Sequence, residues 1–429
     1  MRHLVSLSLL PLLIGAGCGS ARASDPVIEA ATDDDLPALL DSLRRDEGEL
    51  GLDEIGIEDP TGSALHTFHR ALRRAERGQG VASVVVYGGS HTAGDLYTGR
   101  MREVLQARFG DAGHGFVPMV PVITDHWAWG MVIDEAEGFE VMQVSYKRRE
   151  VFRYGLAGAA FLADEPDAFA AVTSDHWGNG RQASRIDLLY DRLPAAGHLE
   201  VWLDGRHAET LDASAAAPTP GLRSFELSDA THRVEVRAAG DGPVTVFGVV
   251  EQRGDQPGVL VHNLGLVGAK ARHQLLWDEE LWAHYFTRLA PDLVVFSYGN
   301  NETTDTHLSI ADHERQLREA LGRVSRATPD ASCLLVGPTD RPRELEDGTL
   351  EAREIVLELT EMQRRVARDL GCGFFDTLAF QGGLGAGIVW LQHEPPYLRP
   401  DRQHLSRYGY RRWGEALLRG LLAGYTPPA

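Results

Sequence analysis

A serine follows the end of a strongly apolar stretch in the first quarter of the chain. Residues 81–87 are mostly apolar and β-branched, and Gly88 and Gly89 then lead directly to Ser90. This pattern predicts a buried strand that stops at a tight turn. Because open α/β sheets place reactive groups at the carboxyl ends of their strands, Ser90 is a candidate nucleophile. A serine at such a turn could equally cap the next helix, so the assignment needs a base and an oxyanion hole elsewhere.

The residues that could supply these parts occur later in the chain. Asp401 and His404 are three positions apart, ahead of a final helix predicted from about 406 to 422. In a serine hydrolase a histidine deprotonates the serine and a carboxylate orients the histidine. Gly268 and Asn301 follow two further predicted strands, where they could donate hydrogen bonds to an oxyanion. Each has an ordinary structural explanation as a cap, a surface histidine, a helix-entry glycine or a turn residue, but their joint occurrence favours a catalytic site.

Alternating strands and helices are predicted around these positions. After residues 81–87, strand patterns recur at 259–263, 292–297, 332–336 and 373–376, with helical patterns between them. Such alternation predicts a parallel sheet with helices on both faces. We therefore expect an α/β fold with a doubly wound, flavodoxin-like sheet of five strands.

Between residues 140 and 258 the apolar period changes to two. Short strand patterns alternate there with turn residues such as Asp204-Gly205. This rhythm is typical of an antiparallel β-sandwich. We therefore predict an α/β domain in two parts, residues 61–139 and 259–429, with a β-sandwich inserted over 140–258.

The first residues indicate export. The apolar run of residues 4–14 is too short to span a membrane, and small residues follow it as far as Cys18. We expect residues 1–23 to be a signal peptide, and the protein to reach the periplasm or cell envelope. The surroundings of Cys18 are similar to a lipoprotein processing site, although Gly15 replaces the usual leucine; plain cleavage a few residues later is the alternative. Residues 24–60 are acidic and poor in aromatics, which predicts a linker.

Composition narrows the possible partners. The chain of 429 residues carries 42 basic and 62 acidic side chains, a formal charge of −20. This balance argues against a nucleic-acid partner. The 17 histidines show no close ligand spacing, so we expect no metal and no cofactor. Cys333 and Cys372 each begin a predicted strand, and they could be buried free thiols or, in an oxidising compartment, a disulfide.

The candidate residues resemble the conserved blocks of SGNH (GDSL-type) hydrolases. The matching segments are Gly88-Gly89-Ser90-His91, the turn from Asn263 to Gly268, Gly299-Asn300-Asn301, and Asp401 to His404. The resemblance implies that Ser90 is the nucleophile, His404 the general base and Asp401 its orienting partner. It also implies an oxyanion hole formed by the backbone amides of Ser90 and Gly268 and the Asn301 side chain. The family usually has an aspartate at the position of Gly89; that aspartate supports the turn rather than attacking the substrate.

A narrower resemblance concerns the segments around the first block. Ser90 to Asp95 and the loop 109–117, followed by an inserted all-β module, are similar to bacterial peptidoglycan O-acetylesterases, whose module resembles a carbohydrate-binding domain. The resemblance implies a secreted serine esterase that removes O-acetyl groups from a polysaccharide, with peptidoglycan as the first candidate. We expect His91, His114 and Asn300 to contact substrate, although the loop that carries His114 could instead be pinned by aromatic packing.

Two other functions fit the same residues. An esterase or O-acetyltransferase acting on another exported glycan or a lipid would use the same triad. A non-catalytic glycan-binding lipoprotein would explain Gly89 as a mark of a decayed site. In each case the expected partner is an acetylated polysaccharide or a related molecule, and the membrane is reached only through a lipid anchor at Cys18.

Overall fold

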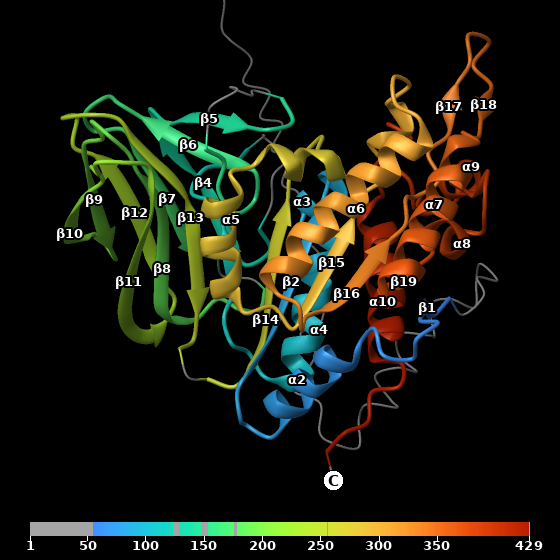
Figure 1. The fold of residues 1–429 in the computed structure, drawn as a ribbon, viewed down its shortest axis with the longest axis horizontal. Helices are drawn as coiled ribbons and strands as arrows, with labels where there is room; N and C mark the ends of the chain where they lie inside the picture. The colour runs from blue at the N-terminus through green and yellow to red at the C-terminus, as the bar shows by residue number, and fades with distance from the viewer. Residues whose placement is uncertain (1–54, 123–127, 147–152, 176–177, 255, 429) are drawn as a thin grey trace, which may run out of the picture.

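A computed structural model describes residues 55–429, apart from 123–127, 147–152, 176–177, 255 and 429 (Figure 1). The predicted signal peptide, Cys18 and most of the predicted linker lie outside the described residues. Within that described part of the chain, no helix is both long and apolar enough to cross a membrane.

The α/β part of the fold is formed by two separate stretches of the chain. Its strands are β1 (Ile57–Glu58), β2 (Val81–Gly88), β14 (Gly258–Gly265), β15 (Leu293–Ser297), β16 (Ser332–Val336) and β19 (Gly373–Phe375). Its α-helices are α2 (His66–Glu76), α3 (Ser90–Ala93), α4 (Leu96–Phe109), α5 (Glu279–Phe286), α6 (Ile310–Ala327), α7 (Ile355–Leu370), α8 (Thr377–Gln381), α9 (Ala386–Gln392) and α10 (Arg407–Leu422). Short 3₁₀ helices occur at η2 (Ala271–Leu276), η3 (Thr287–Leu289) and η4 (Glu302–Thr304), and β17 (Arg343–Glu344) pairs with β18 (Leu350–Glu351).

The central sheet has the strand order β1-β19-β16-β15-β2-β14. The five strands from β19 to β14 are parallel, whereas β1 pairs antiparallel with β19. The α/β class predicted from the sequence is confirmed, but the sheet has one more strand than expected. That extra strand, Ile57–Glu58, lies inside the segment 24–60 that was predicted to be a linker. Two residues show too little periodicity to mark a strand, and only the exposed edge of β19 brings it into the sheet.

Both faces of this sheet are buried, as the alternation of side chains along β2 shows. Val84 and Val86 belong to one hydrophobic cluster, together with residues of α2, α4 and α10. Val85 and Tyr87 belong to a second cluster, together with residues of α5, α6 and α7. Successive side chains of a strand point to opposite faces, so a strand covered on both sides must be apolar at every position.

The intervening residues form two antiparallel sheets (Figure 1). The first has the order β10-β9-β12-β7-β4, and the second β11-β8-β13-β6-β5, with β3 also paired to β13. Their bounds are β3 (Gly115–Val117), β4 (Met131–Glu137), β5 (Glu140–Gln143), β6 (Ala159–Ala163), β7 (Phe169–Ser174), β8 (Ala183–Arg192), β9 (His198–Leu203), β10 (Arg206–Asp212), β11 (Thr219–Ala230), β12 (Arg233–Ala238) and β13 (Val244–Gln252). The antiparallel strands thus begin before residue 140, the expected boundary, because β3 and β4 pair with strands of these sheets.

Helix α5 joins the antiparallel sheets to the α/β part. The Tyr285 hydroxyl donates to the carbonyls of Tyr190 (2.6 Å) and Gly221 (2.9 Å). Its ring packs edge-on against Phe247, with ring centroids 5.8 Å apart. Buried residues of both antiparallel sheets and of one face of the central sheet belong to the same hydrophobic cluster. The two parts therefore share a core, and the antiparallel sheets are not tethered loosely.

Cys333 and Cys372 form a disulfide. Leu334 of β16 faces Gly373 of β19 in the parallel register, which places the preceding residues side by side. Of the two alternatives that the sequence leaves open for these cysteines, the structure shows the disulfide.

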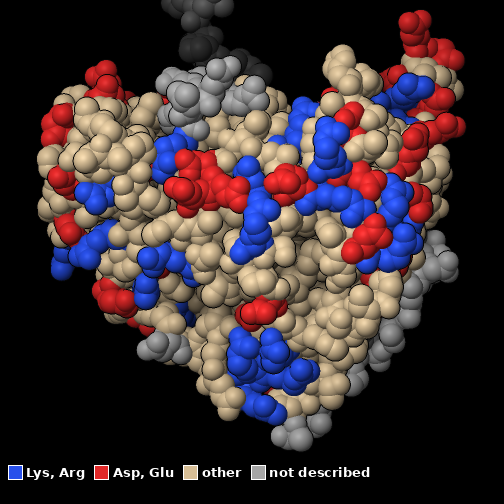
Figure 2. All heavy atoms as spheres, in the orientation of Figure 1, with Lys and Arg blue, Asp and Glu red and all other residues tan. Residues whose placement is uncertain are grey.

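Charged side chains of both signs are spread over the face in Figure 2, where basic side chains gather over α2.

Glu251 on β13 is a fully buried glutamate, and its carboxylate oxygens have no hydrogen-bond partner among the described residues. Burial raises its pKa from 4.5 to about 8. The unfolded chain therefore loses this proton near pH 4.5, while the folded chain keeps it until about pH 8, so rising pH destabilises the fold in that window.

Glu251→Gln should remove this pH dependence. Between pH 5 and pH 7, the free energy of unfolding of the variant should rise by roughly 2–3 kcal/mol relative to that of wild type. Urea unfolding at pH 5 and at pH 7 measures the free energy of unfolding of both proteins. The exposed Glu226 supplies a matched control, Glu226→Gln, and parallel curves for wild type and Glu251→Gln would contradict the prediction.

Candidate active site

Ser90, His404 and Asp401 form a continuous chain of hydrogen bonds. The distance from His404 Nε2 to Ser90 Oγ is 2.7 Å, and His404 Nδ1 lies 2.8 Å from Asp401 Oδ2. The other carboxylate oxygen accepts the backbone N–H groups of Gln403 (3.0 Å) and His404 (2.9 Å). Partial burial acts to raise the pKa of Asp401, but the hydrogen bonds from Gln403 and His404 outweigh it and lower the pKa. Asp401 is thus held ionised beside the imidazole, which suits an orienting carboxylate.

A tight loop presents Asp401 and His404 to the same side. The N–H of Arg399 donates to the carbonyl of His404 at 2.8 Å, which closes the loop. At its tip, Arg402 adopts a left-handed conformation with φ 60°. This conformation is unfavourable for a residue with a side chain, and such strain persists only where the surroundings impose it. Here the Arg402 guanidinium is held by Glu344 of β17 at 2.7 Å.

Ser90 is the first residue of the short helix α3, which rests directly on the backbones of β2 and β14. A Cβ added to Gly88 would lie 2.0 Å from Thr92 Oγ1, and one added to Gly265 would lie 2.2 Å from the Ala93 nitrogen. Both strand ends therefore require glycine, because α3 approaches them too closely for any side chain. This close packing fixes the position of Ser90 relative to the carboxyl ends of β2 and β14.

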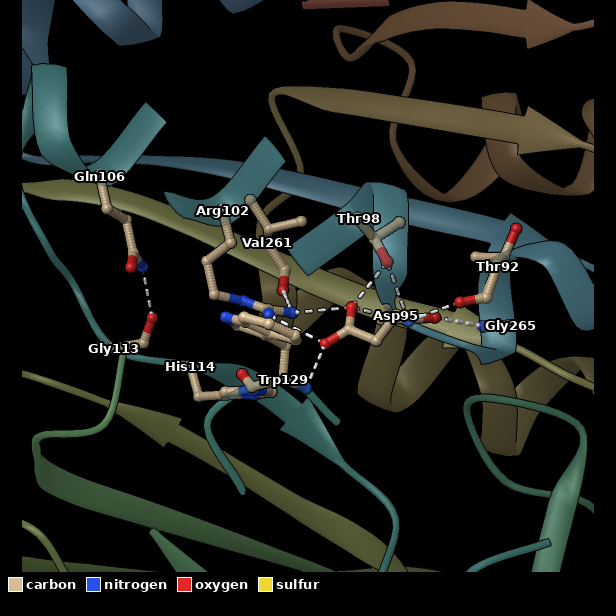
Figure 3. Close-up of polar contacts among 11 residues, drawn as sticks. Thr92, Asp95, Thr98, Arg102, Gln106, Gly113, His114, Trp129, Val261 and Gly265 are labelled. Atoms are coloured by element: carbon tan, nitrogen blue, oxygen red, sulfur yellow. Dashed lines mark hydrogen bonds and ion pairs between the residues drawn. The ribbon is translucent and has the colours of Figure 1, made fainter. Parts of the chain in front are cut away.

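A buried carboxylate, Asp95, anchors the far end of this turn (Figure 3). It accepts hydrogen bonds from Thr98 Oγ1 (2.6 Å), Asn263 Nδ2 (2.9 Å) and the backbone N–H of Trp129 (2.7 Å). Arg102 Nη1 donates to the same carboxylate at 3.0 Å, and both side chains of this ion pair are 1% exposed. Burial acts to raise the pKa of Asp95, but the Arg102 charge and these hydrogen bonds outweigh it and lower the pKa.

Asn263 connects this ion pair to the helix that carries Ser90. Its Nδ2 donates to the Thr92 carbonyl at 2.7 Å, and its Oδ1 accepts the N–H of Gly265 at 2.9 Å. Asp95, Asn263 and Arg102 thus tie α3 to the start of α4 and to β14. This network can hold the nucleophile turn in a chain that has no aspartate at position 89.

The Gly89 backbone lies against the side chain of Asn301. A Cβ at Gly89 would stand 2.8 Å from Asn301 Nδ2, too close for any residue other than glycine unless Asn301 moves. The same amide donates to the carbonyl of Ala269 at 2.8 Å. The structure thus brings Asn301 next to Ser90 on one side and to the loop of Gly268 on the other. Gly268 has a φ of +70°, which explains the need for glycine there.

Glu302 links the loops that hold Gly268 and Asn301. Its buried carboxylate accepts the N–H groups of Ala271 (2.9 Å) and Gly299 (3.0 Å). Burial raises the pKa of Glu302, against the lowering effect of these backbone donors. Sequence analysis did not single out this residue, although it follows the block of Asn300 and Asn301 directly.

The three residues expected to contact substrate are instead buried among protein partners. His91, His114 and Asn300 are 3%, 1% and 9% exposed. His91 Nδ1 lies 2.8 Å from the Tyr410 hydroxyl, His114 Nε2 lies 3.1 Å from the carbonyl of Trp129, and the Asn300 amide contacts Thr339. In this conformation they are placed to support the site rather than to meet a ligand.

His91 packs against His404, the predicted general base. The two imidazole rings are 5.4 Å apart, and the Trp413 ring lies 5.6 Å from that of His91. Burial, together with the nearby His404 and Arg341, lowers the pKa of His91 to about 3. His91 is therefore neutral, so it packs against His404 without placing a second positive charge beside that ring.

The antiparallel sheets also reach the site. Ser145 Oγ donates to the carbonyl of Val267 at 2.7 Å, and a Cβ at Gly268 would meet the hydroxyl of Tyr146 at 2.6 Å. Tyr146 is 66% exposed. It follows β5 and was not predicted as a site residue, because no local pattern shows that this turn lies over the Gly268 loop.

Residues 234–412 match the model of the GDSL-like Lipase/Acylhydrolase family. The match includes Gly268, Asn301, Asp401 and His404, and it begins after Ser90, within β12. The chain contains a GDSL-type acylhydrolase domain. The family and the enzyme class predicted from the sequence, a carboxylic ester hydrolase, are thereby confirmed.

Solved structures show what the acylhydrolase fold resembles. A peptidoglycan O-acetylesterase matches with a TM-score of 0.69 and 21% identity, over 86% of this chain and 98% of that chain. An acetyl xylan esterase matches with a TM-score of 0.29 and 18% identity, over 38% of this chain and 81% of that chain. The first match shows a shared fold that extends over the antiparallel sheets as well as the acylhydrolase domain. No curated protein matches the sequence.

Proposed function

We propose that this acylhydrolase is an exported serine esterase that removes O-acetyl groups from a polysaccharide, with peptidoglycan as its substrate. The observation that carries the proposal is the hydrogen-bonded chain from Asp401 through His404 to Ser90, beside the Gly89 and Asn301 contact. A nucleophile, a base, an orienting carboxylate and an amide donor are thus assembled in one place.

Ser90 Oγ attacks the carbonyl carbon of the ester while His404 Nε2 takes its proton. Asp401 stabilises the resulting imidazolium and keeps Nδ1 protonated. Negative charge then develops on the former carbonyl oxygen. The Asn301 amide has a second N–H beyond the one given to Ala269, and with the backbone N–H groups of Ser90 and Gly268 it would bind this oxyanion. One such donor is worth roughly 10²–10³ in kcat.

Collapse of the tetrahedral intermediate breaks the bond to the sugar oxygen. His404 gives its proton to that oxygen, the sugar hydroxyl leaves, and the acetyl group remains on Ser90. A water molecule, deprotonated by the same histidine, attacks this acetyl-enzyme and releases acetate. Each step uses a group already present in the chain.

The choice of a polysaccharide rests on two further observations. The fold is shared with a peptidoglycan O-acetylesterase. The antiparallel sheets, which we propose to bind carbohydrate, bring the exposed Tyr146 to Gly268, where its ring could pack on a sugar. Export through residues 1–23, with lipid attachment at Cys18, would place the enzyme in the cell envelope.

Acetate release from three polymers tests this proposal. We expect the purified mature protein to release acetate from O-acetylated peptidoglycan, more slowly from acetylated xylan, and not from peptidoglycan that was deacetylated with base beforehand. Adding a soluble sugar acceptor while following free acetate separates hydrolysis from transfer. Faster release from xylan than from peptidoglycan would contradict the substrate assignment, and retention on peptidoglycan without acetate release would favour the glycan-binding alternative.

A further inference from the structure

Two partly buried arginines lie beyond the carboxyl end of β16, at the same edge of the sheet as the proposed catalytic residues. Arg341 lies in the loop after β16, and Arg353 precedes α7. Arg341 Nη1 donates to the carbonyl of Asn300 at 3.4 Å, and Arg353 Nε donates to the carbonyl of Arg341 at 3.1 Å. The Arg341 guanidinium therefore stands one residue away from Asn301, the side-chain donor of the proposed oxyanion hole.

Neither arginine is in an ion pair with a carboxylate of the described residues. Their neighbours differ in this respect: Arg343 is paired with Glu351 and Arg402 with Glu344, both at 2.7 Å. The carboxylate that acts on Arg341 is Asp401, which is engaged by His404. Arg353 faces a further cation, Arg343. Of the described residues, therefore, no carboxylate forms an ion pair with either guanidinium, although Asp401 attracts that of Arg341.

Such an arrangement is unfavourable in the free protein. Burial and the neighbouring Arg353 lower the pKa of Arg341, and burial and Arg343 lower that of Arg353. Partly desolvated like charges repel one another, and an anion between them would relieve both costs. A guanidinium offers two parallel N–H donors, a geometry that suits a carboxylate.

We propose that Arg341, backed by Arg353, binds a carboxylate of the substrate beside the scissile ester and so selects acidic over neutral acetylated glycans. This inference rests on the proposed esterase function. It also narrows the substrate class: peptidoglycan carries carboxylates on its peptides, and on the lactyl ether where no peptide is attached, whereas an acetylated xylan backbone has none. Arg341 is here a specificity residue, and it takes no part in bond making.

The test compares two soluble substrates that differ only in charge. One is an O-acetylated peptidoglycan fragment, and the other is the same fragment after its carboxylates have been converted to primary amides. We expect wild type to favour the acidic fragment by about 10-fold or more in kcat/KM, through KM. In Arg341→Gln this ratio should fall toward one. Arg341→Lys should keep part of the preference, because lysine retains the positive charge but lacks the two parallel N–H donors of a guanidinium. Added salt should shrink the wild-type ratio.

Arg343→Gln is the matched control, since this arginine is nearby, exposed and already paired with Glu351. It should keep the wild-type ratio. If Arg341→Gln does not fold, Arg353→Gln and the salt series carry the same test. A ratio near one in wild type, or an unchanged ratio in Arg341→Gln, would overturn the inference and leave the esterase function intact. Failure to release acetate from either fragment would instead count against the proposed function.

Discussion

Ser90→Ala is expected to lose at least about 10⁴-fold in kcat/KM toward p-nitrophenyl acetate. The reason is that Ser90 Oγ, 2.7 Å from His404 Nε2, is the nucleophile of the proposed mechanism. Without it, the remaining groups can bind the ester and stabilise an oxyanion, but no acetyl-enzyme can form. Removing one hydroxyl from a partly exposed position should leave the fold unchanged, so the melting temperature should stay close to that of wild type.

A covalent probe gives a second, independent measurement. A fluorophosphonate should label wild type once, on the peptide that contains Ser90, and should not label Ser90→Ala. Ser228→Ala, at an exposed serine of β11, is the matched control and should keep both labelling and activity. Activity of Ser90→Ala comparable to wild type, or labelling at another serine, would refute the mechanism.

The sequence was informative wherever function is tied to a strand end. Continuous apolar runs alternating with helical patterns predicted the α/β class, because a strand buried on both faces, such as β2, must be apolar throughout. Turn glycines after such strands then marked the edge at which Ser90 and Asn301 meet. The loop of Asp401 and His404 was found because both residues lie close together in sequence, which makes their joint orientation a local property.

Contacts between distant segments were beyond the reach of the sequence. His91 and His114 are polar residues in a promising neighbourhood, and only the structure shows that Tyr410 and Trp129 cover them. Tyr146 reaches the Gly268 loop through the packing of the antiparallel sheets. Gly89 was interpreted as a loss of support, yet it makes room for Asn301, while Asp95 anchors the turn from the other end. These contacts depend on close approaches, such as the 2.8 Å between a Cβ at Gly89 and Asn301 Nδ2, that no local sequence pattern encodes.

Asp95→Asn is expected to destabilise the fold by about 3–5 kcal/mol, because it leaves the buried Arg102 charge without a counterion. Asparagine suits this test: it matches aspartate in size and also tolerates the left-handed conformation of residue 95, which has φ 47°. Loss of charge is then separated from backbone strain. Urea unfolding measures the stability. Since Asp95 and Asn263 hold α3 in place, kcat toward p-nitrophenyl acetate should also fall. This loss should be measurable at temperatures well below the melting temperature, where the variant is folded.

A double-mutant cycle with Arg102→Met decides whether the ion pair itself is responsible. Arg102→Met alone leaves Asp95 buried without its main positive neighbour, so it too should be strongly destabilising. The double variant Asp95→Asn/Arg102→Met removes both charges, and its loss of stability should be smaller than the sum of the two single losses. Additive losses would show that the two side chains act independently. In that case the nucleophile turn would owe its position to the close packing of α3 on Gly88 and Gly265, and Gly88→Ala would become the more damaging change.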